Sequence, residues 1–169
     1  MSAFDPILRG AAASAVGTAV MDASIYGRFR REGGTEPWPA WESSQGLGNW
    51  DHAPAPARVA KRFLERVLGR EVPPRYARAL NNATHWGFGM AAGAAYGLLV
   101  QDKKSKLWYG PPFGAAVWAS GYAALPQLGV YKQIWEYDAK TLRTDLGHHL
   151  VFGTATAAAF SILARTKEH

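Results

Sequence analysis

Uncharged, largely hydrophobic residues are gathered into long blocks, and the charged residues lie between these blocks. Three blocks carry no charge over 23, 25 and 19 residues, at positions 79–101, 107–131 and 146–164. A fourth block, near 7–26, is less regular, because its uncharged centre ends at Asp22. A helix needs about 20 apolar residues to cross the hydrocarbon of a bilayer. The pattern therefore predicts a single all-α domain over residues 1–169, an integral membrane bundle of four helices at these four positions.

A soluble, Ala-rich globule with buried helices is the alternative to this membrane bundle. The mean hydropathy of -0.18 favours it at first sight. That average, however, includes the polar stretch 28–78, which holds ten of the nineteen Lys and Arg residues. A soluble helix also shows a polar stripe, and the three uncharged blocks have almost none. The distribution of charge therefore favours the membrane.

The stretch 28–78 is predicted to be a loop that contains one amphipathic helix. Pairs of glycines and several prolines indicate irregular structure at its start. From Ala57 to Gly69, hydrophobic residues such as Phe63 and Val67 recur on one side of a helix. Four basic residues recur on the other side: Arg58, Lys61, Arg62 and Arg66. Such a helix can lie in the membrane interface and bind anionic lipid, or it can simply pack on the bundle.

The charge and the cysteine count narrow the partners and the chemistry. The formal net charge is +6, but the basic residues flank the apolar blocks and do not form one face with base-stacking aromatics. This arrangement favours anionic lipid over nucleic acid. The chain has no cysteine, which excludes disulfides, thiolate metal sites and cysteine nucleophiles. Asp5 and Arg9 before the first block argue against a cleavable signal peptide.

The Lys and Arg counts also predict the orientation in the membrane. The first and third loops together carry thirteen of these residues, and the termini with the second loop carry six. Basic loops stay on the cytoplasmic side. We therefore expect residues 28–78 in the cytoplasm and both termini outside.

An internal repeat relates the second and fourth blocks. Shifted by 64 residues, His85 lies over His149 and Gly89 lies over Gly153, with seven identities in the fifteen positions from His85 to Leu99. The first and third blocks align more weakly at a shift of 100 residues, through Gly10 and Gly110. The pattern predicts a duplicated helical hairpin.

Small residues at fourfold spacing follow one face of each predicted helix. In lipid, such faces allow close approach of helix backbones. The candidate packing positions are Gly89, Gly93, Gly97, Gly153, Gly110 and Gly114. They could pack within the chain, or in a homo-oligomer or larger membrane complex.

Ionisable residues inside the blocks are the candidate functional residues, because such groups are costly in a bilayer and face the protein interior or water. They are His85, His149, Asp145, His148 and Asp22. Asp145 precedes His149 by one turn and could orient its imidazole. Three interpretations stay open: hydrogen bonding within the bundle, proton or ion handling, and a haem or metal site between His85 and His149. No spacing matches a haem or zinc motif, so cofactor and metal stay unknown.

Four segments together resemble the YagU-like family of small bacterial inner-membrane proteins of unknown function: residues 82–89, 94–97, 113–118 and 144–153. The resemblance covers all four blocks, through short Ala- and Gly-rich motifs. It implies a multi-pass protein of the bacterial inner (plasma) membrane, with a link to acid tolerance. It supplies no catalytic residues.

These observations predict a non-enzymatic membrane protein, a small transport, channel or accessory subunit. The second hypothesis is a membrane redox protein that binds haem or a metal through His85 and His149. The third is a membrane enzyme with Asp145 and His149 as acid and base. The third lacks a recognisable nucleophile, oxyanion hole or substrate pocket in the sequence.

Overall fold

The computed structural model describes residues 4–100 and 107–165, and every regular element in these two ranges is helical. The predicted all-α class is confirmed. The α-helices are α1 (Phe4–Arg31), α2 (Trp38–Glu42), α3 (Ala55–Leu68), α4 (Ala77–Val100), α5 (Gly110–Ala124) and α6 (Ala139–Arg165). Three short 3-10 turns, η1 (Pro74–Tyr76), η2 (Leu107–Tyr109) and η3 (Ile134–Glu136), precede α4, α5 and α6.

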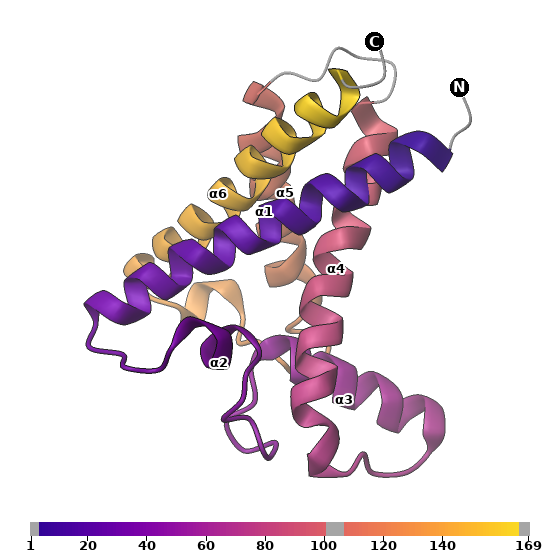
Figure 1. Cartoon of the computed structure of the whole chain (residues 1–169). Coiled ribbons are helices and arrows are strands. Elements are labelled where there is room, and N and C mark those ends of the chain that lie inside the picture. The colour runs from indigo at the N-terminus through magenta and orange to yellow at the C-terminus, as the bar shows by residue number, and fades with distance from the viewer. Residues whose placement is uncertain (1–3, 101–106, 166–169) are drawn as a thin grey trace.

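The long helices α1, α4 and α6 form the body of the molecule, with α1 between the other two (Figure 1). Gly10 of α1 lies against Gly93 of α4, and Asp22 lies against His85, so these helices are antiparallel. Gly17 lies against Thr156 of α6, and Ser24 bonds to His148, so α6 is also antiparallel to α1. The fourth helix of the bundle, α5, packs on α6.

Aromatic side chains close one end of this bundle. The ring of Tyr96 in α4 lies 4.8 Å from that of Phe113 in α5 and 5.6 Å from that of Phe160 in α6. Ala13 and Val100 complete the small hydrophobic core at this end. The four helices therefore converge here, and they separate toward the opposite end (Figure 1).

The opposite end carries α2, α3 and the turns between α5 and α6 (Figure 1). The amphipathic helix predicted over residues 57–69 is present as α3, which ends at Gly69 in a left-handed conformation (φ 64°). This helix lies across α4, and Ala57 and Ala60 are the residues it buries.

Three helix lengths differ from the prediction. The helix α6 begins at Ala139, seven residues before the predicted start at 146. The structure extends α1 over 28 residues, past the expected end near residue 26, until Gly33 (φ 95°) allows the chain to reverse. It shortens the helix expected over 107–131 to the 15 residues of α5, about 22 Å at 1.5 Å per residue. Pro111 and Pro112 suit its first turn, and Pro126 cannot donate a helical hydrogen bond beyond its end. The predicted end of the second helix, residue 101, lies outside the described residues.

Glycines let the helices approach closely at two interfaces. A Cβ atom added to Gly93 would lie 2.1 Å from Cβ of Ser14 and 2.3 Å from the carbonyl oxygen of Gly10. A Cβ atom added to Gly114 would lie 2.0 Å from the carbonyl oxygen of His149. Neither distance is compatible with a side chain, since carbon contacts normally lie at about 3.5–4.0 Å. The glycines are therefore required for the backbone contacts of α1 with α4 and of α5 with α6.

The two interfaces use different registers of the aligned positions. Gly10 faces Gly93 in the first pair of helices, whereas Gly110 faces Gly153 in the second. In the alignment of the blocks, Gly93 corresponds to Ala157, one turn beyond Gly153. The second pair of helices is therefore displaced by one helical turn relative to the first.

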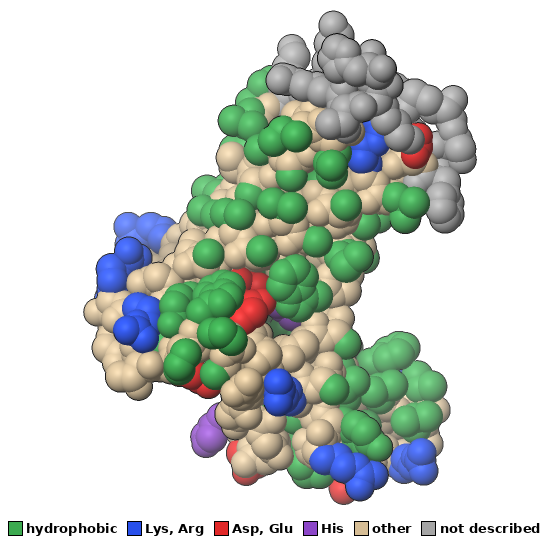
Figure 2. Space-filling model, in the orientation of Figure 1, with side chains coloured by type: hydrophobic (Ala, Val, Ile, Leu, Met, Phe, Trp, Pro, Cys, Tyr) green, Lys and Arg blue, Asp and Glu red, His purple; other side chains and the backbone are tan. Residues whose placement is uncertain are grey.

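Buried and exposed side chains are distributed in an unusual way. The largest side chains that are fully buried are Tyr96, Thr18, Thr156 and Ser14. Large hydrophobic side chains lie outside on the same helices, among them Leu8, Val16, Leu99 and Ile162. We call the bundle of α1, α4, α5 and α6 the shaft. On the visible face of the shaft, Figure 2 shows mostly hydrophobic and uncharged atoms, with charged side chains near its ends. Apart from a few large buried residues, among them Tyr96, Phe152 and Phe160, the helices thus bury small and hydroxyl-bearing residues and expose large hydrophobic ones.

Candidate functional site

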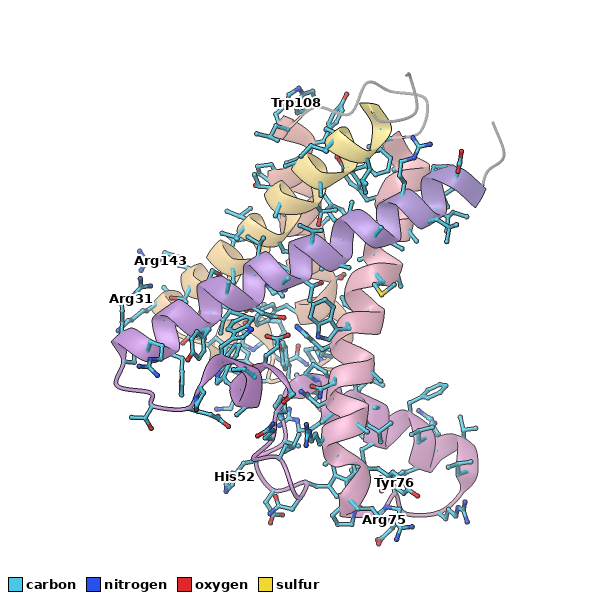
Figure 3. All side chains as sticks on the ribbon, viewed as in Figure 1. Arg31, His52, Arg75, Tyr76, Trp108 and Arg143 are labelled. Carbon is cyan, nitrogen blue, oxygen red and sulfur yellow. The ribbon has the colours of Figure 1, made fainter. Side chains whose placement is uncertain are left out.

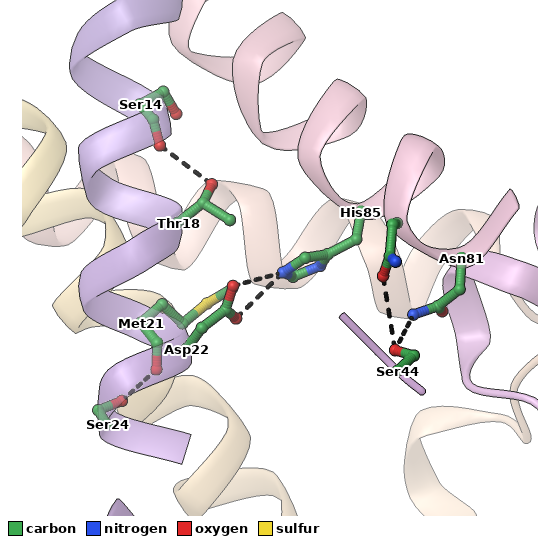
Figure 4. A network of polar contacts seen from close by, with 9 residues as sticks. Ser14, Thr18, Met21, Asp22, Ser24, Ser44, Asn81 and His85 are labelled. Carbon is green, nitrogen blue, oxygen red and sulfur yellow. Dashed lines mark hydrogen bonds and ion pairs between the residues drawn. The ribbon is translucent and has the colours of Figure 1, made fainter. Parts of the chain in front are cut away.

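Asp22 and His85 form an ion pair across the interface of α1 and α4. The Nε2 atom of His85 lies 2.9 and 3.0 Å from the two carboxylate oxygens of Asp22 (Figure 4). The Asp22 side chain is 5% exposed and the His85 side chain is 28% exposed. Because an ionised carboxylate only accepts hydrogen bonds, the imidazole donates from Nε2. This leaves Nδ1 of a neutral His85 as an acceptor.

Glu42, at the end of α2, adds a second carboxyl group to this pair. Its side chain lies near Asp22, His85 and Trp86. Its Oε1 atom is buried and has no hydrogen-bond partner within the described residues. Burial, followed by the negative charge of Asp22, raises the pKa of Glu42 above its ordinary value. Two neighbouring carboxyl groups disfavour a state in which both are ionised, so Glu42 is the member of the cluster that more readily keeps a proton.

Polar contacts continue from this cluster to the loop after α2. The Asn81 side chain donates to the hydroxyl of Ser44 at 3.0 Å (Figure 4). The Asn82 side chain donates to the carbonyl oxygen of Ser43 at 2.9 Å. Ser44 has a positive φ of 51°. The start of α4 is thus tied to the loop that positions Glu42.

Asp145 and His149 form a second polar group, one turn apart on α6. Nδ1 of His149 donates to the backbone carbonyl of Asp145 at 2.9 Å and lies 3.6 Å from its carboxylate. Tyr122 of α5 lies near the Asp145 carboxylate. With Nδ1 as the donor, Nε2 of a neutral His149 is an acceptor.

A cavity of about 540 Å³ lies where the helices separate, and it brings the two polar groups to one space. We call it the central cavity. His85, His149 and Asp145 line it, together with residues from α1, α3 and α5. Most of its wall is apolar, with Phe88, Phe152 and Trp118 as the largest contributors. A mostly apolar pocket of this size with a few convergent polar groups is typical of a small-molecule site.

A second cavity, of about 470 Å³, adjoins the first. Tyr122, Tyr131 and Asp145 line both cavities. Arg28 and His148 line only the second. His148 bonds through Nδ1 to the hydroxyl of Ser24 at 2.8 Å. Asp145 therefore lies between the mostly apolar central cavity and the second cavity, which is lined by the cationic side chain of Arg28.

The structure assigns different surroundings to the residues predicted from the sequence. His85, His149 and Asp145 come together in the central cavity. Asp22 is buried behind His85, and His148 belongs to the second cavity. Sequence reasoning missed Glu42, Trp118 and Tyr122. Trp118 and Tyr122 lie in an uncharged block, and Glu42 lies in a short helix within a segment predicted to be irregular, so periodicity carried no signal for them.

The four basic residues predicted to bind lipid also differ from one another. Arg62 donates to the carbonyl of Leu128, and Lys61 lies 5.4 Å from the Trp50 ring centroid and 3.8 Å from Glu65. The Nε atom of Arg58 is buried without a hydrogen-bond partner in the described residues. Arg66 is exposed. The first three are thus partly committed to the protein itself.

The donor set limits which metals the site could hold. No group of three His, Cys, Asp or Glu side chains within residues 4–100 and 107–165 is arranged to bind a metal ion. Two histidines with one acceptor nitrogen each could still hold a group that needs two axial ligands. The other ring nitrogen of each histidine is already fixed by an acceptor, as is usual for ligating histidines.

No family model, curated protein or solved structure matches this chain. The fold and the site define it as an all-α protein with a cavity between its long helices, whose wall is mostly apolar and carries a few polar groups. In the part that the structure describes, one helix is by itself long and apolar enough to cross a membrane: α6, over Ala139–Ala164.

Proposed function

We propose that this protein is a non-enzymatic, multi-pass membrane protein, a small transport or accessory subunit that binds a solute in the central cavity. The inverted distribution of side chains carries the membrane part of the proposal. Ser14, Thr18 and Thr156 are buried while Leu8, Leu99 and Ile162 are 55%, 71% and 63% exposed. In water, large hydrophobic side chains are the ones that folding buries. In lipid, small and hydroxyl-bearing residues form the helix contacts and large apolar ones face outward.

Helix lengths support a bilayer as the surroundings. With 28, 24 and 27 residues, α1, α4 and α6 are about 36–42 Å long at 1.5 Å per residue, more than the hydrocarbon thickness of about 30 Å. Exposed tryptophans lie at the two ends of the bundle: Trp108, 61% exposed, before α5 and Trp135, 78% exposed, before α6. Tryptophan is enriched at both membrane interfaces. Figure 3 shows Trp108 at one end and Arg31 and Arg143 toward the other.

The modest hydropathy of α1 and α4 has a structural reason. Several of their polar residues, namely Asp22, Asn81, Ser14 and Thr18, are buried. These residues lower the average hydropathy of each helix, but lipid would not contact them. The shorter α5 packs on α6, and the proposal treats it as a fourth span with turns completing the crossing.

The central cavity supports binding of a solute. Its wall is mostly apolar, and its polar groups are the acceptors of His85, His149 and Asp145. The aromatic contacts of Tyr96 with Phe113 and Phe160 fill the other end of the bundle. In this conformation, access is therefore from the end that carries α3. Because the glycine faces already pack within the chain, the proposal does not use them for contacts with a partner.

Alkaline carbonate extraction of membranes tests insertion, and cysteine labelling tests the cavity. The natural chain has no cysteine, so single replacements can be labelled without background. Ser120→Cys and Thr84→Cys place a thiol on the cavity wall, and Leu99→Cys places one on the outward surface of α4. We expect the protein to stay in the membrane pellet. We also expect a membrane-impermeant maleimide to label Ser120→Cys and Thr84→Cys from one side only, and Leu99→Cys only after detergent denaturation.

Two outcomes would contradict these expectations separately. Release of the protein into the carbonate supernatant would defeat the membrane proposal. Retention in the pellet with no labelling at positions 84 and 120 from either side would leave the membrane proposal standing and remove the solute cavity.

A second candidate function is a membrane redox protein with a haem or metal in the central cavity. The observation that favours it is the convergence of His85 and His149 on one cavity, each with one ring nitrogen fixed by an acceptor. A Soret band in protein purified from haem-supplemented cells, lost in His85→Ala and His149→Ala, is the expected result of this candidate. Colourless, metal-free protein with intact cavity labelling would favour the transport or accessory role.

The proposal places the protein in a bacterial inner membrane, as the family resemblance implies. It also places α2, α3 and the turns between α5 and α6 on the cytoplasmic side, because the described residues at that end include most of the Lys and Arg residues. Positively charged loops are retained in the cytoplasm.

A further inference from the structure

The outer surface of α3 is hydrophobic and has no cover within the described residues. Phe63 and Val67 are each 65% exposed, and Leu68 is 51% exposed. The side of α3 that packs on the bundle uses small residues instead, Ala57 and Ala60. Phe63 and Val67 lie one turn apart on the helix, and Leu68 directly follows Val67; we call these three exposed side chains the α3 strip.

The position of α3 relative to the bundle determines which way the α3 strip faces. The helix lies across α4 and not along it (Figure 1). On the α3 lobe in Figure 2, hydrophobic side chains gather on the side toward the uncharged shaft of the bundle, and Lys and Arg side chains lie on the far side. On α3, as on the bundle, the apolar surface therefore lies toward the middle of the shaft and the charged surface lies away from it.

Charge on the far side is strongly positive. The segment 55–78 holds seven Lys or Arg residues and two Glu residues. Arg66 and Arg70 are exposed, whereas Arg62 and Lys61 already contact other groups of the protein. A helix with a large apolar face and basic residues opposite is the pattern of helices that lie in the plane of an anionic membrane surface.

We infer that α3 lies in the headgroup region of an anionic lipid leaflet, with Phe63 and Val67 inserted toward the acyl chains and Arg66 and Arg70 at the phosphates. This inference rests on the proposed membrane insertion of the bundle. A bilayer is the partner, because a bilayer that surrounds the shaft would also contact the α3 strip. Since Ala55, Pro56 and Val59 of α3 also line the central cavity, the helix on the lipid surface forms part of the cavity wall.

Depth-dependent quenching in nanodiscs tests where α3 lies. Phe63→Cys and Arg66→Cys are each labelled with bimane in the full-length protein, and Leu99→Cys serves as the control on the outer surface of α4. The nanodiscs contain phosphatidylcholine with phosphatidylglycerol. We expect a nitroxide-bearing lipid to quench the label at position 63 and iodide to leave it largely unquenched. At position 66, we expect quenching by iodide.

Each outcome separates the inference from the membrane proposal. Equal quenching by iodide at positions 63 and 66, with the label at position 99 protected, would overturn the inference and leave the membrane proposal intact. Quenching by iodide at position 99 as well would overturn the membrane proposal itself.

A separate measurement tests whether α3 prefers anionic lipid. The spectral blue shift of the label at position 63 should be larger with phosphatidylglycerol than with phosphatidylcholine alone. The double replacement of Arg66→Gln and Arg70→Gln should abolish this difference. The matched control is Arg75→Gln, which removes an equally exposed charge outside α3 whose side chain lies over the Tyr76 ring; it should retain the difference. A blue shift that does not depend on phosphatidylglycerol in the natural sequence would overturn the assignment of an anionic leaflet.

Discussion

Replacing Gly93 by alanine would add one methyl group at a point where α1 and α4 are in close contact. The added carbon would lie 2.1 Å from Cβ of Ser14 and 2.3 Å from the carbonyl oxygen of Gly10. Ordinary carbon contacts lie at about 3.5–4.0 Å, so the helices would have to separate by roughly 1.5 Å. One of the two clashing groups is backbone, which no change of side-chain rotamer can relieve.

The separation has an energetic cost that can be worked from the contacts. Overpacking of a tight interface typically costs about 1–3 kcal/mol. Moving the helices apart also weakens the hydrogen bond from the Ser14 hydroxyl to the carbonyl of Gly89, which is 2.7 Å long and which in a membrane contributes about 0.6 kcal/mol. The gain in helix propensity from glycine to alanine, about 1 kcal/mol, opposes these losses.

Gly87→Ala is the matched control, because it makes the same chemical change on the same helix where no atom lies within 4 Å of the added carbon. The propensity gain is common to both variants, so their difference isolates the packing. We expect Gly93→Ala to be less stable than Gly87→Ala by about 2–3 kcal/mol. At roughly 2–4 °C per kcal/mol for a chain of this size, Tm should differ by about 4–12 °C.

Thermal unfolding of both variants in the same detergent, followed by circular dichroism, measures this difference. Gly93→Leu should lower Tm further than Gly93→Ala, because a larger side chain forces the backbones further apart. Equal Tm values for Gly93→Ala and Gly87→Ala would refute the close approach of α1 and α4. A lower Tm for Gly87→Ala would show that the two faces of α4 have been assigned the wrong way round.

Three further predictions concern charge and orientation. Burial and the charge of Asp22 raise the pKa of Glu42. The contribution of Glu42 to stability is therefore present below its unfolded pKa and is lost as pH rises through its folded pKa. Because the glutamine of Glu42→Gln cannot ionise, the Tm of this variant should fall less than that of the natural protein between about pH 4 and pH 8. Asp138 accepts hydrogen bonds from the backbone N–H groups of Lys140 and Thr141 at the start of α6, both 2.9 Å long, so Asp138→Ala should lower Tm and Asp138→Asn should largely preserve it. Because the bonds to Thr141 lower the pKa of Asp138, the difference between Asp138→Ala and the natural protein should disappear as pH falls through that value. A C-terminal reporter that is active only in the cytoplasm should be silent; strong activity would reverse the orientation and leave the helices unchanged.

The predicted fold class depended on features that are local in the chain. Long uncharged blocks, and the proline and glycine residues between them, were enough to predict helices at the positions of α1, α4, α5 and α6. The end of α5 was missed because residues 125–131 are uncharged and apolar, although turns follow Pro126. Hydrophobicity alone does not separate an apolar helix from an apolar turn.

The candidate site was accessible from the sequence only in part. Histidines and carboxylates within or beside the uncharged blocks can be picked out one by one, because an ionisable group in an apolar block is uncommon and costly to bury. The pairing of Asp145 with His149 was predicted, because these residues lie one turn apart. The pairing of Asp22 with His85, 63 residues away, could not be deduced. Glu42 lies near them at the end of the short helix α2, in a segment where the sequence showed no periodicity.

Composition and periodicity thus determined that this chain is helical, where its apolar surface lies along the chain and which helix faces carry small residues, since each of these follows from neighbours within a turn or two. Tertiary structure alone decided which small-residue faces meet, that the two helix pairs differ in register by one turn, and that Asp145 and His149 share a cavity with His85. The physical reason is that contacts between distant helices depend on the shapes of both faces at once. A glycine can accept any neighbour that fits, and only the folded backbone selects one.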